Sequence, residues 1–317
     1  MSGPSITLVV NPHAGAGRGE AVLPAVERAL RDLGARVTVA RTAASEDATR
    51  LVREAIAAGT EGIAVIGGDG TLSEATNGFF VKGEAIPTNV WLGPVSVGTG
   101  GDFRKSLGAG NVGTGRARVD EVVGRMWRAA VRPIDVGHLA YVANDGSQRE
   151  RTFLNITSFG IGGLVDRLVN DSPKWMGGGP AFFIGSARAL ARYRPQRVRM
   201  TVDDRAPREA TITNIAVCNG RFFGGGMHIA PDARLDDGRF DVVTMHAVSL
   251  GRAARLTPRL YRGTHIGEDG VGFERGRVVS AEPIDPNEHV LLDVDGEAPG
   301  RLPARFEVKP GALRLRG

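Results

Sequence analysis

The stretch Ile66-Gly-Gly-Asp-Gly-Thr-Leu-Ser-Glu-Ala-Thr-Asn-Gly78 is the most specific pattern in this chain of 317 residues. It follows an apolar run at residues 62–66 that is typical of a buried strand. The glycines around Asp69 permit a backbone turn that larger residues would obstruct. A triphosphate bound there would repel the Asp69 carboxylate unless a cation or water lay between them, so the pattern indicates Mg²⁺. The alternative is a tight turn followed by an N-capped helix.

Two further glycine-rich turns follow strand-like runs. They are Asn11-Pro-His-Ala-Gly-Ala-Gly-Arg-Gly19 and Pro94-Val-Ser-Val-Gly-Thr-Gly-Gly-Asp-Phe103. Neither is a Walker A loop, and the first taken alone is equally compatible with a flexible connection. Because the carboxyl ends of parallel strands meet at one edge of a sheet, the three turns together predict a phosphate-binding crevice.

Strands and helices alternate around these turns. We expect strands at residues 5–10, 36–40, 62–66 and 91–97, one helix at 20–33, and a second helix that begins after Ser45 as its N-cap. This alternation predicts a largely parallel sheet with helices on both faces, that is, an open α/β domain that binds a nucleotide.

Short alternating segments replace this pattern after about residue 132. We expect strands near 134–142, 152–157, 197–202, 210–217, 239–246, 289–294 and 305–308, with helices near 179–193 and 250–261. Turn residues separate the strands, which favours a mostly antiparallel β-domain. The predicted domains are residues 1–132 and 133–317, divided near Arg132-Pro133.

Composition limits the classes of function. The formal charge of +5 and pI of about 9.8 indicate an anionic partner, and nucleic acid, an anionic membrane and a polyphosphate all fit. The basic residues are dispersed, so we expect no nucleic-acid partner. No run approaches the ~20 apolar residues of a membrane span, and the start of the chain lacks signal-peptide features, so we expect a cytoplasmic protein.

Several other kinds of site find no support in the sequence. Cys218 is the only cysteine and lies in an apolar run, so we predict a small buried residue there. The six histidines lack the spacing of a zinc enzyme, and there is no Gly-x-Ser-x-Gly elbow.

Two acidic turns lie in the second half of the chain. Asp236-Asp237-Gly238 is either a plain β-turn or a cation site built from one carboxylate and nearby backbone carbonyls. Asp293-Val-Asp295-Gly-Glu297 places three acids in five residues. Crowded like charges favour a raised pKa or a nearby cation, which suits a general base, although a solvated turn is the plainer interpretation.

With these motifs in order, the chain resembles the soluble diacylglycerol-kinase catalytic family, which includes bacterial lipid kinases and the sphingosine and ceramide kinases. The Gly67-Gly-Asp-Gly-Thr71 signature is also similar to that of NAD kinases, whereas the two C-terminal blocks favour a lipid kinase. The resemblance implies an α/β domain followed by a β-sandwich, with the nucleotide between them.

The resemblance also implies roles for individual residues. ATP would be surrounded by Asn11, Pro12, His13, Ala14, Gly15, Thr42, Gly67, Gly68, Asp69, Gly70, Thr71, Leu72, Ser73, Glu74 and Thr99. Asp69 and Asp135 would act on the nucleotide Mg²⁺ through water. Asp237, with the carbonyls of Arg234 and Arg239, would form a structural Mg²⁺ site, and Glu297 would be the general base. Gly101 and Ser73 stand where many relatives have asparagine.

We therefore expect an ATP- and Mg²⁺-dependent lipid kinase of phospholipid metabolism, with diacylglycerol as the first candidate substrate. The alternatives are a kinase of NAD or another soluble alcohol, and a nucleotide- or lipid-binding regulator without catalysis. The aromatic and basic stretch from Lys174 to Arg194 suits shallow docking at the inner membrane face, or equally well packing on the β-domain.

Overall fold

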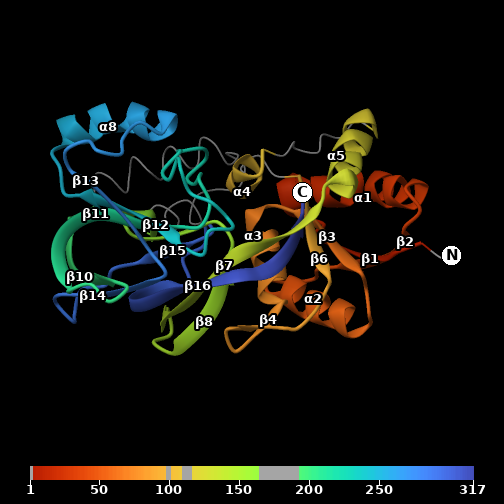
Figure 1. The fold of residues 1–317 in the computed structure, drawn as a ribbon, viewed down its shortest axis with the longest axis horizontal. Coiled ribbons are helices and arrows are strands. Elements are labelled where there is room, and N and C mark those ends of the chain that lie inside the picture. Colours follow the sequence, from red (N-terminus) through yellow and green to blue (C-terminus); the bar gives the residue numbers. More distant parts are fainter. Residues whose placement is uncertain (1–2, 98–100, 109–115, 164–192) are drawn as a thin grey trace. The chain divides into compact units, whose positions relative to one another are not determined.

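The computed structural model describes residues 3–97, 101–108, 116–163 and 193–317. The chain forms two compact units (Figure 1). Unit 1 comprises Met1–Ile134 and Gly311–Gly317, and unit 2 comprises Asp135–Pro310. No helix in the described part of the chain is long and apolar enough to cross a membrane.

Unit 1 is built on a parallel sheet. Its strands are β1 (Ser5–Val10), β2 (Arg36–Arg41), β3 (Gly62–Gly67) and β6 (Trp91–Ser96), in the spatial order β6-β3-β1-β2. The end of β16 (Gly300–Arg316) adds a parallel strand beside β6 through Arg314 and Leu315. A two-stranded hairpin, β4 (Phe80–Val81) and β5 (Glu84–Ala85), completes the unit's strands in the described residues.

Helices cover both faces of this sheet. They are α1 (Ala14–Asp32), α2 (Asp47–Ala57), α3 (Asp69–Asn77), α4 (Asp102–Ser106) and α5 (Arg116–Arg128). Figure 1 shows α1 and α5 on one side of the strands and α2 on the other. Leu23 and Leu30 of α1 and Val123 of α5 pack with Leu8 and Ile66 in one buried cluster. The inner strands β1 and β3 are buried along nearly their whole length because helices cover both faces, whereas the edge strand β2 is partly exposed.

Unit 2 is mostly antiparallel β-structure. Its strands are most of β7 (Val131–Ala143), β8 (Gln148–Phe153), β9 (Ile156–Gly160), β10 (Gln196–Val202), β11 (Arg208–Cys218), β12 (Phe240–His246), β13 (Val271–Gly276), β14 (Val278–Pro283), β15 (Leu292–Val294) and most of β16. One helix in the described part of this unit, α8 (Leu250–Arg262), lies between β12 and β13 in the chain.

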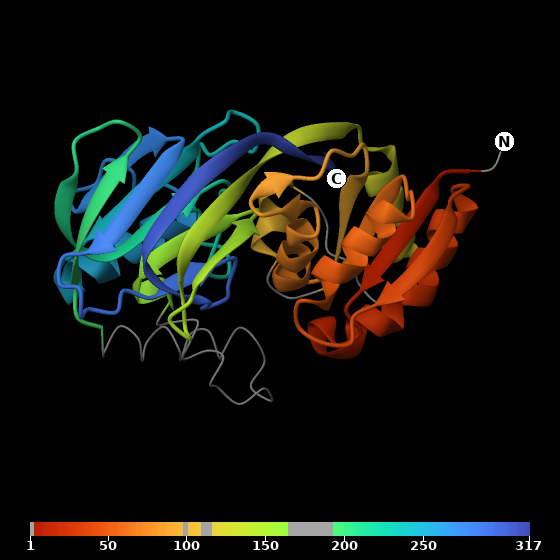
Figure 2. The same cartoon turned by 90° about the horizontal axis from the view of Figure 1, so that it is seen from below.

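The strand order explains the sandwich-like form of unit 2. A path β13-β12-β11-β10-β14-β16-β7-β8 runs along the sheet, and β9 and β15 branch from the second half of β11. Figure 2 gives a second view of the strands. Side chains from these strands enclose one apolar core, which includes Phe159, Ile215, Phe240 and Phe306, all 0% exposed. The predicted combination of an α/β domain and an antiparallel β-domain is confirmed.

Three local expectations differ from the structure. Residues 152–157 form two strands because the chain leaves the ladder at Leu154 and Asn155, whose N–H groups bond to Asp295. Ser45 does not cap α2, where Glu46 is the N-cap with a left-handed φ of 66°. The expected strand at 305–308 is part of the much longer β16, and most of the expected helix at 179–193 lies outside the described residues.

The two units also divide the chain differently from the predicted domains. The structure separates them between Ile134 and Asp135, where the expected boundary was Arg132-Pro133. Gly311–Gly317 belongs to unit 1 because Arg314 and Leu315 pair with Trp91 and Leu92. The last strand therefore adds to a sheet whose other members lie in the first third of the sequence.

The core of unit 2 provides a test of its packing. The rings of Phe159 and Phe306 stack with centroids 5.9 Å apart. Replacing Phe306 by alanine should lower the free energy of unfolding by about 3–5 kcal/mol, because the lost contacts leave a cavity. Phe273→Ala, at a side chain that is 41% exposed, should cost less than about 1 kcal/mol. Urea titrations followed by circular dichroism measure both, and equal losses would contradict this description of the core.

Candidate active site

The first glycine-rich turn of unit 1 is tied to the second by Asn11. Its backbone N–H donates to the Ile66 carbonyl at 3.0 Å, and its Nδ2 donates to Thr71 Oγ1 at 3.1 Å. Its Oδ1 accepts from the backbone N–H of His13 at 3.0 Å. Asn11 therefore fixes the exit of β1 against the turn after β3, and this joins two of the predicted phosphate-binding loops.

The residues after Asn11 form an unusual backbone turn at the start of α1. Gly15, Ala16 and Gly17 all have positive φ, at 61°, 61° and 86°. A side chain at Gly15 would bring its Cβ within 2.6 Å of the Val97 carbonyl oxygen, so this position requires glycine. A left-handed alanine is uncommon and is found where the surrounding structure imposes it. Turns of this kind direct backbone N–H groups toward one point and can bind an anion.

Asp69 joins the second turn to the third. It is the first residue of α3, and its Oδ2 accepts from the backbone N–H of Asp102 at 2.9 Å. Asp102 is 8% exposed, and its Oδ1 accepts from Lys105 Nζ at 2.7 Å. Gly101 has a φ of 73°, a left-handed conformation that glycine and asparagine both tolerate. The difference from the family pattern at this position is therefore compatible with the same backbone shape.

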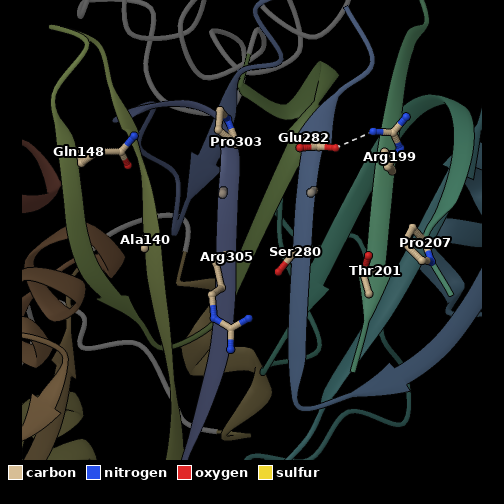
Figure 3. A pocket seen from close by; sticks show the side chains of 11 residues that line it. Ala140, Gln148, Arg199, Thr201, Pro207, Ser280, Glu282, Pro303 and Arg305 are labelled. Atoms are coloured by element: carbon tan, nitrogen blue, oxygen red, sulfur yellow. Dashed lines mark hydrogen bonds and ion pairs between the residues drawn. The ribbon is translucent and has the colours of Figure 1, made fainter. Parts of the chain in front are cut away.

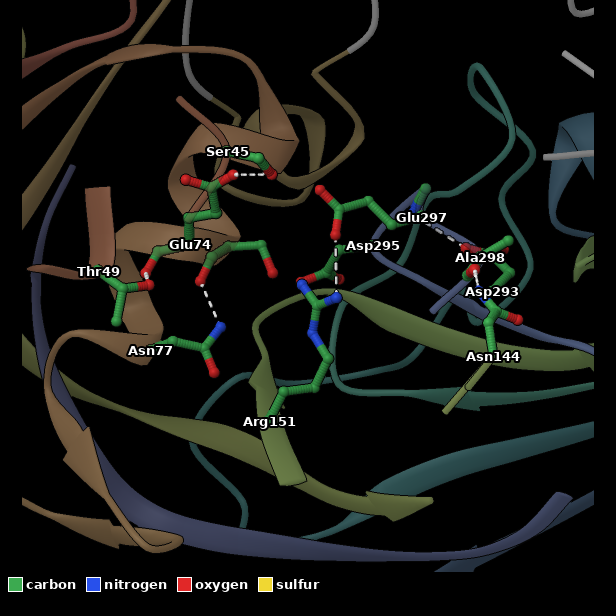
Figure 4. A network of polar contacts seen from close by, with 12 residues as sticks. Ser45, Thr49, Glu74, Asn77, Asn144, Arg151, Asp293, Asp295, Glu297 and Ala298 are labelled. Carbon is green, nitrogen blue, oxygen red and sulfur yellow. Dashed lines mark hydrogen bonds and ion pairs between the residues drawn. The ribbon is translucent and has the colours of Figure 1, made fainter. Parts of the chain in front are cut away.

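The other predicted nucleotide residues lie around these loops. Thr42 donates its backbone N–H to the Val10 carbonyl at 2.9 Å, so it follows β2 at the same edge. Glu74 on α3 accepts from Ser45 Oγ and, through its carbonyl, from Thr49 Oγ1 (Figure 4). The side chains of Leu72 and Ser73 are buried, at 5% and 1% exposure. Pro12 and Ala14 belong to the first turn, Gly67, Gly68 and Gly70 to the second, and Thr99 lies outside the described residues.

In unit 2, Glu297 lies on a tight turn after β15. The turn is closed by paired backbone hydrogen bonds between Val294 and Glu297, at 2.8 and 3.1 Å. The Glu297 side chain is 41% exposed, and its Oε2 accepts from Arg151 Nη1 at 2.9 Å (Figure 4). The arginine side chain is only 14% exposed. A carboxylate that is held at one oxygen and half exposed can accept a proton from a substrate at the other.

Asp295 holds this turn in place. Its carboxylate accepts the backbone N–H groups of Leu154, Asn155 and Ile156, at 3.0, 3.1 and 3.1 Å. Such charge-assisted bonds are about twice as strong as neutral ones. Asp295 itself has a φ of 51°, which turns the chain so that Glu297 follows two residues later.

The third acid of this motif has donors of its own. Asp293, 6% exposed, accepts from Ser158 Oγ at 3.2 Å and from the Gly296 N–H at 2.9 Å. Each of the three carboxylates is therefore compensated separately. This accounts for their crowding without the cation that the sequence suggested.

Asp135 is buried in unit 2, at 2% exposure. Its Oδ2 accepts the Gly238 N–H at 2.7 Å, and its own N–H donates to the Leu235 carbonyl at 2.6 Å. Its carbonyl accepts from Asn219 Nδ2 at 3.0 Å. Asp135 thus anchors the loop that carries Asp237.

The surroundings of Asp237 are anionic. Its Oδ1 accepts the Arg239 N–H at 3.1 Å. Nearby Asp241 is 3% exposed. Its Oδ1 accepts from Arg275 Nε at 2.6 Å, and its Oδ2 is buried without a hydrogen-bond partner among the described residues. The pKa of Asp241 is raised, first by burial and then by the Asp237 and Asp232 carboxylates. The Arg275 guanidinium opposes this shift without cancelling it. A cation would suit this field, although no cluster of three His, Cys, Asp or Glu residues in the described ranges could hold a metal by itself.

Arg234, the other predicted contributor to this metal site, lies on the same loop. Its side chain is exposed and pairs with Asp236 at 3.2 Å, so only its backbone carbonyl could contribute. Cys218 is fully buried, as predicted, and burial raises the pKa of its thiol.

Sequence reasoning missed Arg151, Asn155 and Asn219. Asn219 is 0% exposed, and its Nδ2 bonds both the Asp135 and the Leu154 carbonyls, at 3.0 and 2.7 Å. Asn155 Nδ2 donates to the Phe222 carbonyl at 2.7 Å. Asn219 opens the run Asn219-Gly-Arg-Phe-Phe-Gly-Gly-Gly-Met-His-Ile-Ala-Pro-Asp-Ala-Arg-Leu-Asp-Asp-Gly-Arg-Phe240, whose density of glycine and acid was the one available signal. Arg151 lies on β8, where polar residues and another arginine surround it in the sequence, and no local pattern distinguishes it.

A shallow hollow lies elsewhere on unit 2, over β7, β8, β10, β14 and β16 (Figure 3). Its lining includes Thr201, Ser280 and Arg305, and Arg199 and Glu282, which pair at 2.9 Å. None of its lining residues is a predicted site residue, so we do not assign the chemistry to it.

The chain is similar to known lipid kinases along nearly its whole length. Residues 5–139 match the diacylglycerol kinase catalytic domain, and residues 155–317 match the YegS C-terminal NAD kinase beta sandwich-like domain. The chain is 29% identical to a diacylglycerol kinase of Mycobacterium tuberculosis over 310 residues, covering 98% of this chain and 94% of the relative. It is 30% identical to a probable YegS-like lipid kinase of Pseudomonas aeruginosa over 305 residues, covering 94% and 90%.

Solved structures show the same fold. A putative diacylglycerol kinase from Bacillus anthracis superposes with a TM-score of 0.77 at 23% identity, covering 100% of this chain and 96% of that one. Yeast NADH kinase matches with a TM-score of 0.50 at 11% identity, over 99% and 82%. The two domain matches together extend over nearly the whole chain. The chain therefore belongs to the family of diacylglycerol kinases and YegS-like lipid kinases.

Proposed function

We propose that this lipid kinase transfers the γ-phosphate of ATP to the free hydroxyl of diacylglycerol and so forms phosphatidic acid. The observation that carries the proposal is the Glu297 turn, which presents a half-exposed carboxylate on a rigid support. The choice of diacylglycerol is supported by the family's catalytic-domain match and by the relatives of M. tuberculosis and Bacillus subtilis that carry that name.

Unit 1 would hold the nucleotide. The left-handed turn at Gly15–Gly17 and the start of α3 lie at the carboxyl ends of β1 and β3, where backbone N–H groups would meet the phosphates. Oriented N–H groups of this kind bind phosphate oxygens without side-chain charge. Asn11 and Asp69 keep the three loops together, so the amides are in place before ATP arrives.

The acceptor proton would pass to Glu297. Arg151 holds Oε2, which leaves Oε1 to accept the proton. As the hydroxyl O–H bond breaks, the hydroxyl oxygen bonds to the γ-phosphorus, and the bond from that phosphorus to the ADP oxygen breaks. Little covalent catalysis is needed for such a transfer, so positioning and charge stabilisation supply most of the rate.

Two groups of residues would hold Mg²⁺. Asp69 would approach the nucleotide's ion through water, and Asp237 with the carbonyls of Arg234 and Arg239 would hold a structural ion. Asp135, at 2% exposure and bonded to the Gly238 N–H, would act on the nucleotide's ion only through water that reaches its carboxylate. The unpartnered Oδ2 of Asp241 and the neighbouring carboxylates fit a cation near Asp237. Bound Mg²⁺ neutralises phosphate charge at the nucleotide and crosslinks the loop at the structural site.

Glu297→Gln tests the general base. Turnover should fall by about 10²–10⁴-fold, because the amide accepts a proton poorly, while ATP affinity stays within about twofold. Glu288→Gln, a half-buried acid without an assigned role, serves as the matched control. Radiolabelled phosphate transfer and ATP titration calorimetry measure the two effects. Wild-type turnover in Glu297→Gln would refute the assignment.

Asp295→Asn tests the support of the base. The neutral amide loses charge-assisted bonds to three N–H groups, so the free energy of unfolding should fall by about 2–3 kcal/mol. The maximal rate should fall at least tenfold. The Michaelis constant for ATP should not change when the protein is assayed well below its melting temperature. Asp285→Asn is the control, because Asp285 lies on an exposed turn and its Oδ1 accepts the Asn287 N–H at 2.9 Å. A loss of stability without a loss of rate would show that Asp295 does not position Glu297.

Asp237→Asn tests the structural ion. At Mg²⁺ concentrations about tenfold above its dissociation constant, the wild-type melting temperature should rise by about 3–5 °C. The variant should show no such rise, whereas Asp236→Asn on the neighbouring exposed residue should keep it. Calorimetric scans with Mg²⁺ and with EDTA measure this. An equal rise in both variants would place the ion elsewhere.

A further inference from the structure

Helix α8 (Leu250–Arg262) carries an unusual distribution of charge. The helix contains four arginines and no acid, and residues 250–270 contain only Glu268 and Asp269 as acids, a net charge of +2. Its ends are well defined, by Ser249 Oγ accepting from the Arg252 N–H and by left-handed Gly263. The helix is therefore a stable element with a basic surface.

One face of α8 is committed to the protein. Leu256 is 4% exposed, and Leu260 packs on the apolar cluster that includes Cys218 and Val243. On one flank, Arg252 and Arg259 lie seven residues apart and pair with Asp269 and Glu268.

The opposite face points to solvent. Arg255 and Arg262, also seven residues apart, lie on this face and make no hydrogen bond or ion pair with the residues that the structure describes. Ala254, Pro258 and Tyr261 follow the same outward side at intervals of four and three residues, and all three are exposed. The outward face thus combines two uncompensated cations, about 10 Å apart along the helix, with a narrow apolar strip.

Exposed aromatic side chains gather in the same part of the chain. Of the four large hydrophobic residues that are exposed in the described ranges, two are Tyr261 at 49% and Phe273 at 41%. Val271 packs on the cluster under α8, and Phe273 follows it on the same face of β13. Figure 1 shows α8 on one side of the strands that include β13. Tyrosine with a polar tip beside arginine is the composition that suits a membrane–water interface.

A short series of contacts connects α8 to the turn that carries the base. The Leu260 carbonyl accepts the His228 N–H at 2.9 Å, and the His228 ring stacks on Phe222 with centroids 4.2 Å apart. Phe222 accepts from Asn155 Nδ2, and the Asn155 N–H donates to Asp295. A membrane that binds α8 is therefore held by unit 2, the unit that also carries Glu297.

We infer that the outward face of α8 docks this kinase on anionic phospholipid headgroups, with Arg255 and Arg262 binding phosphates and Tyr261 entering the interface. The inference rests on the proposed function, because a kinase without a membrane span in its described residues must meet its lipid at a surface. The charge of the face indicates the partner. Its arginines complement anionic headgroups, and its narrow apolar strip can enter the interface between headgroups and acyl chains.

Arg255→Gln combined with Arg262→Gln tests the docking. Cosedimentation with phosphatidylcholine vesicles that contain phosphatidylglycerol should show an affinity about thirtyfold lower than that of the wild type. Arg28→Gln with Arg128→Gln removes the same charge from exposed positions on α1 and α5 and should bind normally. Tyr261→Ser should weaken binding severalfold, including at high salt, where the arginine contribution is screened.

Turnover on a dispersed short-chain diacylglycerol separates the docking from the catalysis. The Arg255/Arg262 double variant should keep wild-type turnover on it and lose turnover only on vesicle-borne substrate. The docking proposal would be overturned if the Arg255/Arg262 variant bound vesicles as the wild type does, or if the Arg28/Arg128 control lost as much vesicle affinity. It would also be overturned if the Arg255/Arg262 variant lost affinity for DNA alone. A wild-type protein that binds these vesicles through α8 but phosphorylates no lipid would support the docking and refute the proposed function.

Discussion

The carboxylate of Asp295 is the contact on which the candidate base depends. Three consecutive N–H groups at Leu154–Ile156 converge on it. Strand pairing cannot satisfy those groups at the same time, so the chain leaves the ladder there and β8 and β9 become separate strands. The same contact bends the backbone at Asp295 and fixes the turn on which Glu297 lies. A single long-range interaction therefore shapes both a strand break and a candidate catalytic turn.

The segment held by Asp295 also supports the metal loop. Asn219 bonds the Leu154 carbonyl and the Asp135 carbonyl, and Asp135 bonds the N–H of Gly238. The donors of this network are paired mainly with backbone carbonyls, whereas the Oδ1 atoms of Asn155 and Asn219 are buried without a partner among the described residues. The network gives one physical reason why the glycine- and acid-rich block after β11 and the acidic turn after β15 occur in the same chain.

Unit 1 shows how much a local pattern can predict. Its strands, its main helices and the meeting of three glycine-rich turns followed from periodicity and turn residues, because parallel strands bring their carboxyl ends to one edge. The contacts that join the turns, from Asn11 to Thr71 and from Asp69 to Asp102, link the predicted motifs. The predicted ligand roles of these residues remain proposals.

The features that the sequence did not reveal depend on distant partners. The break at residues 154–155 needs an acid 140 positions away, and the pairing of Arg151 with Glu297 spans 146 positions. The return of residues 311–317 to unit 1 depends on an open edge at β6. Ser45 looked like a helix cap but donates to Glu74 instead. A local sequence pattern does not contain these contacts, because each one depends on a distant residue that only the folded chain brings near.

Transfer of labelled γ-phosphate from ATP to a panel of lipids tests whether diacylglycerol is the acceptor. The assay would present diacylglycerol, monoacylglycerol, ceramide and a sphingoid base in mixed micelles with Mg²⁺, and NAD as a soluble control. The proposed reaction gives labelled phosphatidic acid as the main product and no labelled NADP. Label on NAD, or on no acceptor while ATP still binds, would contradict it.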